Sequence, residues 1–295
     1  MSAWGNLPIV VAVDGSETAA AAALWAAGEA TRRHTALLVF TAYGWEDAAF
    51  GGKIYPPSDW LKIKEAEAED MLRETRDTLE AAVPGLEITT EASDRGPVPA
   101  LLEVSERART LVTGEPVGAI AGLFSGSPDV DLAARAHCPV VVVRGAESPA
   151  PDAPVVVGVD GSPLSEAAIA WAFEEASLRN APLLALHAWH DGDTDGLFTE
   201  GNVHFQGEAV EDADRRLLAQ RLAGWQERYP DVKVERVVEH DKPRHRLLAA
   251  SRTAQLIVVG SRGRGGFVGL VLGSTSQALL HHADCPVMVV RAEKV

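Results

Sequence analysis

A glycine-rich stretch near the end of the sequence has the residue types and spacing of an anion-binding loop. The apolar run Leu256–Val259 predicts a buried strand, and Gly260-Ser261-Arg262-Gly263 follows it directly. Glycines there allow a close approach of the backbone or a positive φ. After nine further residues, Gly273-Ser274-Thr275-Ser276 begins a predicted helix that Ser274 can cap. Because a helix start offers unpaired N–H groups and the positive end of a dipole, this stretch predicts a phosphate site.

Charged residues near this loop could bind a ligand that contains both an anionic group and a sugar. Arg262 and Arg264 add positive charge to an acidic protein. Asp160 ends a valine-rich strand, beside Gly161-Ser162, and in a doubly wound sheet it would lie next to the loop, where a carboxylate suits ribose hydroxyls. An alternative role for Asp160 is to cap the helix that follows Pro163, and the two roles are compatible.

Motifs for catalysis or metal binding are incomplete. The sequence has no Gly-x-x-x-x-Gly-Lys-Ser/Thr loop and no lysine near Gly260, so the Walker arrangement for γ-phosphate hydrolysis is missing. No Gly-x-Ser-x-Gly elbow supports a hydrolase triad. Asp191–Gly196 imitates the first half of a calcium loop, but Asn202 replaces its last glutamate. The adjacent pair His281 and His282 lacks helical metal-ligand spacing, so we assign no catalytic and no metal-binding residue.

Composition limits the partners. The chain has 295 residues, of which 46% are hydrophobic, so it is long and apolar enough for two domains with real cores. A formal net charge of −15 repels phosphate polymers and anionic membranes, so neither nucleic acid nor a membrane is expected as a partner. The sequence has no membrane-span run and no signal-peptide pattern, which predicts a cytoplasmic protein. Cys138 and Cys285 are expected to be buried thiols without chemistry.

The sequence contains the same unit twice. Val10–Ser16 recurs as Val156–Ser162, and Gly126-Ser127 matches Gly273-Ser274. Each copy alternates strand and helix patterns, which predicts a parallel sheet with right-handed crossovers and helices on both faces. The duplication divides the chain into domains at residues 1–146 and 153–295, with a proline-containing linker between them.

The first copy illustrates the expected elements. Its strands are predicted at Ile9–Asp14, Ala36–Ala42, Leu86–Glu91, Leu111–Gly114 and Val140–Arg144. Helices are predicted at Glu17–Arg33 and Ser58–Val83, the second from the helical spacing of Leu61, Ala68, Leu72, Thr75 and Leu79. Five such strands suit a doubly wound, flavodoxin-like sheet, whose ligand crevice lies beyond the carboxyl ends of the strands where their order reverses. The long segments 44–57 and 190–207 either fold over this crevice or pack on the surface.

These motifs closely resemble those of the universal stress proteins of the ATP-binding class. The likeness rests on Gly260-x2-Gly263-x9-Gly273-Ser274, on Asp160-Gly161-Ser162 at the first strand, and on Cys285-Pro286-Val287 at the last. It covers essentially the whole chain as two tandem domains, as in stress proteins of actinobacteria. The resemblance implies a flavodoxin-like, adenine nucleotide alpha hydrolase-like fold in each domain, with ATP or AMP as ligand and Mg²⁺ as a further option.

The resemblance also implies roles for individual residues. Asp160 would contact the ribose or adenine, and the Gly158 and Ala188 backbones would line the adenine pocket. The implied phosphate-binding residues are Gly260, Ser261, Arg262, Gly263, Arg264, Gly265, Gly266, Gly273, Ser274, Thr275 and Ser276. The corresponding residues of the first copy are Asp14, Gly126 and Ser127.

Partners and a biological role are implied as well. Family members commonly pair through their last strands, here Val140–Arg144 and Val287–Arg291, so the copies are expected to join and the chain to form a homodimer. Known functions in the family are regulatory, with nucleotide as a signal and protein partners that the sequence does not identify. We therefore expect an ATP-binding stress regulator. A slow ATPase or a phosphoryl or adenylyl transferase is the alternative, and a nucleotide-free scaffold is a third.

The loop of the first copy departs from the pattern. Aligned without gaps from Gly126-Ser127, Thr113 stands opposite Gly260 and Pro116 opposite Gly263. Proline has no N–H and a fixed φ, so this loop cannot form the same phosphate site. Gly114 and Gly118 lie close by, however, and a shifted loop could restore binding.

Charge also separates the two copies. In the same alignment Glu115 stands opposite Arg262, and Asp129 and Asp131 fall at the helix start. Each carboxylate beside a triphosphate costs about 1 to 4 kcal/mol, depending on the local dielectric. We expect firm ATP binding by the second copy, and weak binding, another nucleotide or a scaffold role for the first.

Overall fold

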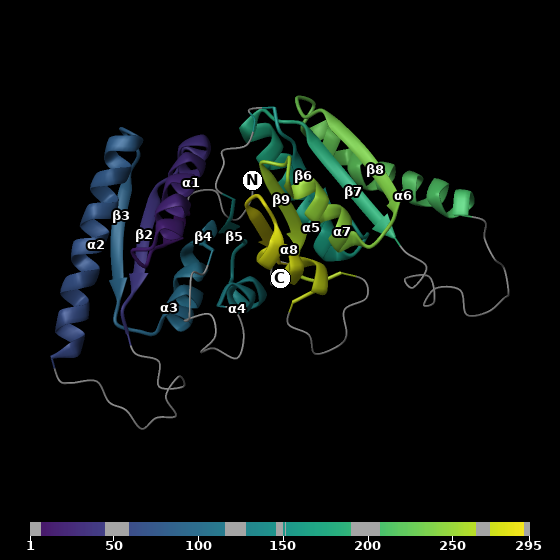
Figure 1. The fold of residues 1–295 in the computed structure, drawn as a ribbon. Helices are drawn as coiled ribbons and strands as arrows, with labels where there is room; N and C mark the ends of the chain where they lie inside the picture. Colours follow the sequence, from purple (N-terminus) through teal and green to yellow (C-terminus); the bar gives the residue numbers. More distant parts are fainter. Residues whose placement is uncertain are drawn as a thin grey trace, which may run out of the picture. The chain divides into compact units, whose positions relative to one another are not determined.

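The computed structural model contains two α/β units. It describes residues 7–44, 59–115, 128–145, 150, 152–189, 207–263 and 272–291, without the side chains of residues 189, 207–214 and 217. The chain divides into Met1–Arg144 and Gly145–Val295, and each unit has its own set of parallel strands (Figure 1). Within the described part of the chain, no helix is long and apolar enough to cross a membrane.

The first unit alternates strands and helices throughout. Its elements are β1 Ile9–Ala12, α1 Glu17–Arg33, β2 Leu37–Ala42, α2 Trp60–Ala82, β3 Ile88–Ser93, α3 Pro97–Val104, the 3-10 helix η2 Ser105–Arg107, β4 Thr110–Gly114, α4 Pro128–Arg135 and β5 Val140–Val143. The strands are parallel, in the order β3-β2-β1-β4-β5. This confirms the predicted five-stranded sheet.

The second unit repeats the arrangement. Its elements are β6 Val155–Gly158, α5 Pro163–Arg179, β7 Leu183–Trp189, α6 Gly207–Arg228, β8 Val234–His240, α7 Pro243–Ser251, β9 Leu256–Gly260, α8 Ser274–His282 and β10 Val287–Val290. Its parallel strands have the order β8-β7-β6-β9-β10. Because the corresponding strands have the same order in both units, the predicted tandem fold is confirmed.

The strand order identifies the edge of each sheet where a ligand is expected. From β1 the chain adds strands in one direction, through β2 to β3, and then returns to the other side of β1 with β4 and β5. With right-handed crossovers, α1 and α2 cover one face and α3 and α4 the other, in agreement with the packing of α1 on α2 and of α3 on α4. The order reverses between β1 and β4, and between β6 and β9, and the carboxyl ends at such a reversal are where doubly wound sheets bind their ligands.

Helix α1 has the predicted bounds because the local sequence specifies both ends. The Ser16 side chain accepts the N–H of Ala19 at 3.2 Å, and His34 ends the helix with a φ of 51°. Small side chains let the helix lie close to the sheet, and they include the fully buried Ala22, Ala26 and Ala30.

Other predictions need adjustment. Strand β1 ends at Ala12, two residues earlier than expected. In α2, Leu61 is 46% exposed, although the later residues Ala68, Leu72 and Leu79 of the same stripe are buried. Both cysteines are free and buried, as predicted, and burial raises the pKa of each thiol to about 12.

Candidate functional site

The turn after β6 orients the Asp160 carboxylate. Gly161 has a φ of +75°, a conformation that favours glycine, and Ser162 is the N-cap of α5, accepting the N–H of Ser165 at 3.2 Å. The Asp160 Oδ1 atom accepts the N–H of Ser162 at 2.9 Å. The alternative in which Asp160 caps the helix is therefore wrong. In the first unit, Asp14 binds the N–H two residues further on in the same way, at 3.0 Å.

The loop after β9 reaches this turn. A Cβ atom added to Gly263 would lie 2.4 Å from Asp160 Oδ2, so a larger residue at this position would require the carboxylate to move. Gly263 does not have a left-handed φ, so the advantage of glycine here is the close approach to the carboxylate and not the backbone conformation. At Gly260 an added Cβ would lie 3.0 Å from the Leu164 Cβ in α5. The two glycines thus let the end of β9 and its loop approach α5 and Asp160.

Hydrogen bonds tie the two ends of the loop together. The N–H of Gly273 donates to the Ser261 carbonyl at 2.8 Å, and the N–H of Ser261 donates to the Val290 carbonyl at 2.8 Å. The buried Ser276 hydroxyl donates to the Gly260 carbonyl at 2.7 Å. The start of α8 is therefore held beside the end of β9, and the Ser276 hydroxyl helps to hold it there.

Helix α8 begins without a side-chain cap. Gly273 is its N-cap residue, with no side-chain hydrogen bond, so the expectation that Ser274 caps the helix is wrong. Ser274 is instead the exposed first residue of the helix, and Thr275 is half-buried. Because the first N–H groups of a helix have no partner within the helix, this start can offer them to an acceptor outside it.

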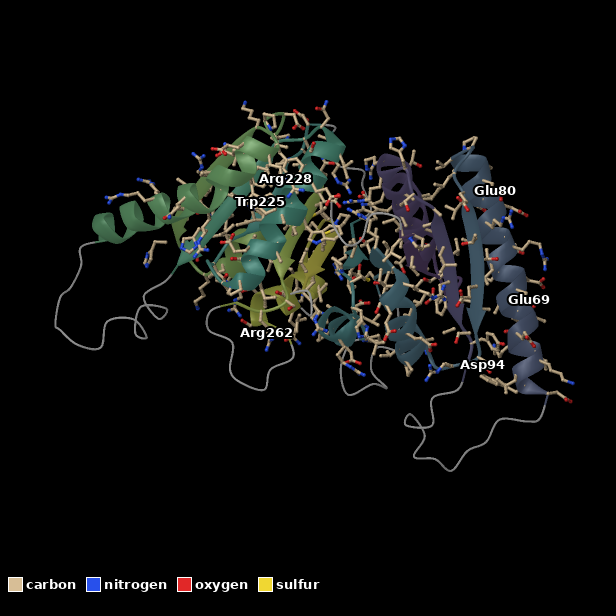
Figure 2. The ribbon with its side chains drawn as sticks, turned by 180° about the vertical axis from the view of Figure 1, so that it is seen from behind. Glu69, Glu80, Asp94, Trp225, Arg228 and Arg262 are labelled. Carbon is tan, nitrogen blue, oxygen red and sulfur yellow. The ribbon has the colours of Figure 1, made fainter. Side chains whose placement is uncertain are left out.

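Two arginines bring like charges together at this loop. Arg262, exposed in the second unit (Figure 2), has its Cα 3.4 Å from the position of a Cβ added to Gly273. Burial of Arg291, the residue after β10, lowers its pKa, and the nearby charge of Arg262 lowers it further. An anion bound between these groups would relieve the repulsion. Sequence reasoning missed Arg291, and its only signal was its position after the last strand.

A buried side chain holds the residue before Asp160. His187 lies on β7 and is only 7% exposed, and its Nδ1 atom is 2.6 Å from the Val159 carbonyl oxygen. Since a carbonyl only accepts, Nδ1 carries the hydrogen. In the first unit the Thr41 hydroxyl donates to the Val13 carbonyl at 2.8 Å. Different side chains therefore support the same carbonyl in the two units.

Gly158 and Ala188, expected near adenine, lie at the same end of the sheet. Ala188 is buried on β7. A Cβ added to Gly158 would lie 3.1 Å from Leu247 Cδ1 and 3.2 Å from Val259 Cγ1, so the glycine lets α7 pack closely on β6.

Other predicted residues fall outside this geometry. Those that lie outside the described residues are Arg264, Gly265, Gly266, Gly126 and Ser127, together with the calcium-like segment Asp191–Gly196. His281 and His282 are exposed in the last turn of α8.

The strand register corrects the alignment of the two loops. Gly114 pairs with Val143 as Gly260 pairs with Val290, so Gly114, and not Thr113, is the counterpart of Gly260. A Cβ added to Gly114 would lie 2.5 Å from the Thr18 carbonyl oxygen, a contact with α1 like that of Gly260 with α5. Counted on from the strands, Glu115 stands opposite Ser261. The first loop is therefore one residue shorter than the second.

In the first unit, an ion pair lies at the carboxyl ends of strands β4 and β5. Glu115 Oε1 lies 2.6 Å from Arg144 Nη2, and the Arg144 side chain is only 9% exposed. Arg144 follows β5 as Arg291 follows β10. The two units thus place an arginine at the same position, with a carboxylate beside it in the first and a second arginine beside it in the second.

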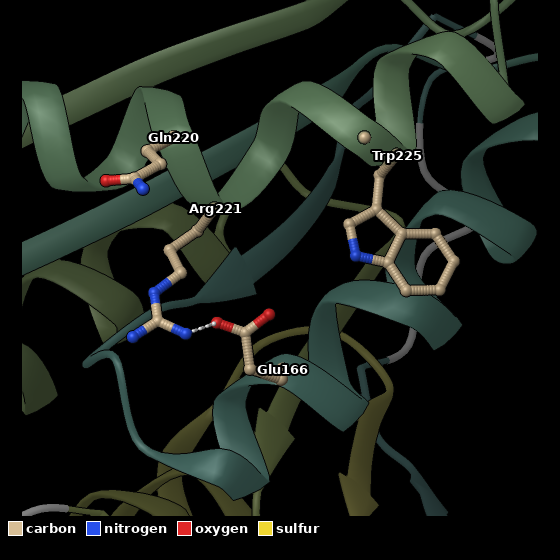
Figure 3. Close-up of a pocket in the computed structure, with 5 residues that line it drawn as sticks. Glu166, Gln220, Arg221 and Trp225 are labelled. Atoms are coloured by element: carbon tan, nitrogen blue, oxygen red, sulfur yellow. Dashed lines mark hydrogen bonds and ion pairs between the residues drawn. The ribbon is translucent and has the colours of Figure 1, made fainter.

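A groove between α5 and α6 involves none of the predicted ligand-binding residues. Its volume is about 530 Å³, and its lining residues are Glu166, Gln220, Arg221, Gly224 and Trp225 (Figure 3). An ion pair at 2.8 Å joins Arg221 of α6 to Glu166 of α5. The Arg228 guanidinium lies 5.5 Å from the centroid of the Trp225 ring (Figure 2). That contact lies within α6, whereas the ion pair and the stacking of Phe173 of α5 on Trp225, with ring centroids 6.2 Å apart, join α6 to α5.

The fold defines a flavodoxin-like class of α/β domain, present twice, with an arginine-containing glycine loop at the carboxyl edge of the sheet in the second copy. A model of the universal stress protein family matches residues 6–144 and 153–291. The chain therefore belongs to the universal stress protein family.

Relatives extend over nearly the whole chain. A universal stress protein of Mycobacterium tuberculosis H37Rv is 42% identical over 290 residues, which cover 96% of each protein. One from Mycolicibacterium smegmatis is 38% identical over 295 residues, again 96% of each. The crystal structure of a universal stress protein from Archaeoglobus fulgidus has the same fold. Its TM-score is 0.71 at 20% identity, with 97% of this chain and 96% of that chain covered.

Proposed function

We propose that the second unit binds ATP at the carboxyl edge of its sheet, and that the protein is a stress-response regulator acting through nucleotide-dependent conformation and partner binding. The observation that carries the proposal is the contact of Gly263 with the Asp160 carboxylate, beside two arginines that repel one another. A carboxylate accepts hydrogen bonds from ribose hydroxyls, while cations and an open helix start attract phosphates. Both ends of a nucleotide have suitable partners around one loop.

Each part of the nucleotide has a proposed partner. Asp160 accepts from the ribose, and the backbones of Gly158 and Ala188 flank the adenine. The phosphates lie on N–H groups of the loop and of the α8 start, near Arg262 and Arg291. Mg²⁺ would accompany the nucleotide on its phosphate oxygens, because this ion keeps most of its water ligands and binds substrate phosphates.

We infer a different role for the first unit. Asp14 keeps the same turn as Asp160, but the Glu115 carboxylate already neutralises Arg144 and would repel a phosphate. This unit would bind nucleotide weakly and serve mainly as a scaffold. From the family likeness, we further propose a cytoplasmic homodimer that pairs through the last strands, together with regulatory protein partners. Light scattering of the purified chain measures the homodimer directly.

Calorimetric titration of the full chain with ATP tests the proposal. We expect one tight site per chain, strongly weakened by Asp160→Asn and unaffected by the matched substitution Asp14→Asn. Two equal tight sites would refute the asymmetry, and the absence of binding would refute the function. Repeated turnover of labelled ATP, lost in Asp160→Asn, would favour a slow ATPase or transferase instead.

A further inference from the structure

Helix α4 of the first unit buries a carboxylate where α8 of the second unit buries a hydroxyl. Asp129 is only 5% exposed, and its Oδ1 atom accepts from the Thr113 hydroxyl at 3.3 Å. Its counterpart is Ser276, because each lies eleven residues before the first residue of the last strand of its unit. Ser276 donates to the Gly260 carbonyl, a neutral contact. A site built around a hydroxyl in one unit therefore contains an ionisable group in the other.

The neighbouring ion pair is fixed from two sides. Besides its 2.6 Å contact with Arg144, Glu115 is held through its backbone, since its carbonyl accepts from the Thr18 hydroxyl at 2.8 Å. The carboxylate of Glu115 therefore gives Arg144 an anion from within the same unit.

Asp129 and the ion pair form one cluster of two carboxylates and one guanidinium. Burial raises the pKa of Asp129 to about 7, the Thr113 hydrogen bond and the charge of Arg144 lower it, and the charge of Glu115 raises it. A single guanidinium cannot neutralise both carboxylates. The buried one is the group that gains most from a proton, because an uncompensated charge is costly away from water.

Other ionisable groups close to α4, among the described residues, have partners of their own. On α3, which packs against α4, Glu103 pairs with Arg95. On α4 itself, Asp131 lies 2.7 Å from Arg135. These pairs are exposed, and none of them is among the charges that shift Asp129.

We propose that the first unit has exchanged an anion site for a proton site, in which Glu115 occupies Arg144 and Asp129 takes up a proton from solvent. The only bond formed is O–H on the carboxylate, and water or buffer supplies the proton. Acidification would then stabilise the first unit, just as an anion would stabilise the second. The comparison with an anion site rests on the proposed function, whereas proton uptake by Asp129 and its test do not depend on nucleotide binding by either unit.

The sign of the pH dependence follows from the direction of the shift. The folded-state pKa of about 7 lies above the 3.8 of an ordinary aspartate, so the folded protein holds the proton more tightly than the unfolded chain. This stabilisation is complete below the unfolded-state pKa and is lost as the pH rises through the folded-state pKa. For a shift of this size, the unfolding equilibrium constant rises about 30-fold between pH 5.5 and pH 8.

Urea unfolding of the full chain at these two pH values tests the role of Asp129. In Asp129→Asn this contribution should disappear. Between pH 5.5 and pH 8, the unfolding equilibrium constant of the wild-type protein should therefore rise about 30-fold more than that of the variant. Other titrating groups, including the histidines, act equally in both proteins. Asp129→Ser, which copies Ser276, serves as the second variant if the asparagine variant does not fold. Equal pH dependence in the wild type and the variant overturns the proposal.

A second substitution isolates Glu115. Glu115→Gln removes the competing carboxylate and leaves Arg144 to pair with Asp129, so the pH dependence should move to lower pH and shrink between pH 5.5 and pH 8. Glu103→Gln, at an exposed carboxylate of the same unit, is the matched control and should change nothing. A purely structural role for Glu115 would leave the pH midpoint where it is, and that result also overturns the proposal.

Discussion

The contact between Gly263 and Asp160 predicts that one added methyl group weakens nucleotide binding without unfolding the protein. In Gly263→Ala the new Cβ would lie 2.4 Å from Asp160 Oδ2, whereas ordinary contact begins at 3.4 Å, so about one ångström of movement is needed. The Ser162 N–H holds the other oxygen, Oδ1, at 2.9 Å, so we expect the carboxylate to turn about that bond and Oδ2 to move away from the ribose. A hydrogen bond to a charged group contributes about 1.5–3 kcal/mol, which is about 10- to 150-fold in Kd.

Calorimetry with ATP measures this loss, and urea unfolding checks the fold. Residue 263 is exposed, so stability should change by no more than about 0.5 kcal/mol. Gly224→Ala is the matched control in the same unit, because nothing lies within 4 Å of its added Cβ. It should leave ATP affinity unchanged and stabilise α6 by about 0.5–1 kcal/mol. Wild-type affinity in Gly263→Ala would refute the reasoning.

Three further predictions follow from the same geometry. His187→Thr copies the first unit and should keep its stability, whereas His187→Val leaves the Val159 carbonyl without its donor and should lose about 1–3 kcal/mol in urea unfolding; equal losses would contradict this. Arg262→Glu replaces the like charge near Arg291 with a carboxylate, so calorimetry should find ATP binding at least about tenfold weaker with no fall in melting temperature, and unchanged affinity would exclude a role in phosphate binding. Burial raises both thiol pKa values to about 12, so neither cysteine should react with a thiol reagent at pH 8 until urea is added; rapid labelling of the native protein would contradict their burial.

The framework of the fold was predictable from local patterns. Helix α1 begins after a serine that can cap it and ends at His34, and both signals lie within the predicted segment or beside it. The valine-rich runs form buried strands because a parallel sheet is covered on both faces. The duplication then required one strand order for both units, and that order alone identifies the carboxyl edge that carries Asp160.

Residues joined by tertiary packing were not predictable in the same way. Arg291 is a neighbour of Arg262 only because β10 lies beside β9, a relation absent from local spacing. The counterpart of Gly260 was misplaced because the alignment allowed no gap, and only the strand register identifies Gly114. Leu61 has helical spacing but remains exposed, since spacing identifies a stripe and not how far the core extends along it.

The comparison of the two units separates what the fold requires from what a ligand requires. Asp14 and Asp160 make the same hydrogen bond in the same turn, so that bond belongs to the fold and is not by itself evidence for a nucleotide. The difference lies in charge, because Arg291 has another arginine beside it and Arg144 has a carboxylate. Binding to the folded state alone stabilises it by about 2.7 kcal/mol at a ligand concentration of 100 Kd. A response to nucleotide should therefore arise in the second unit, where an anion would reduce the repulsion between Arg262 and Arg291.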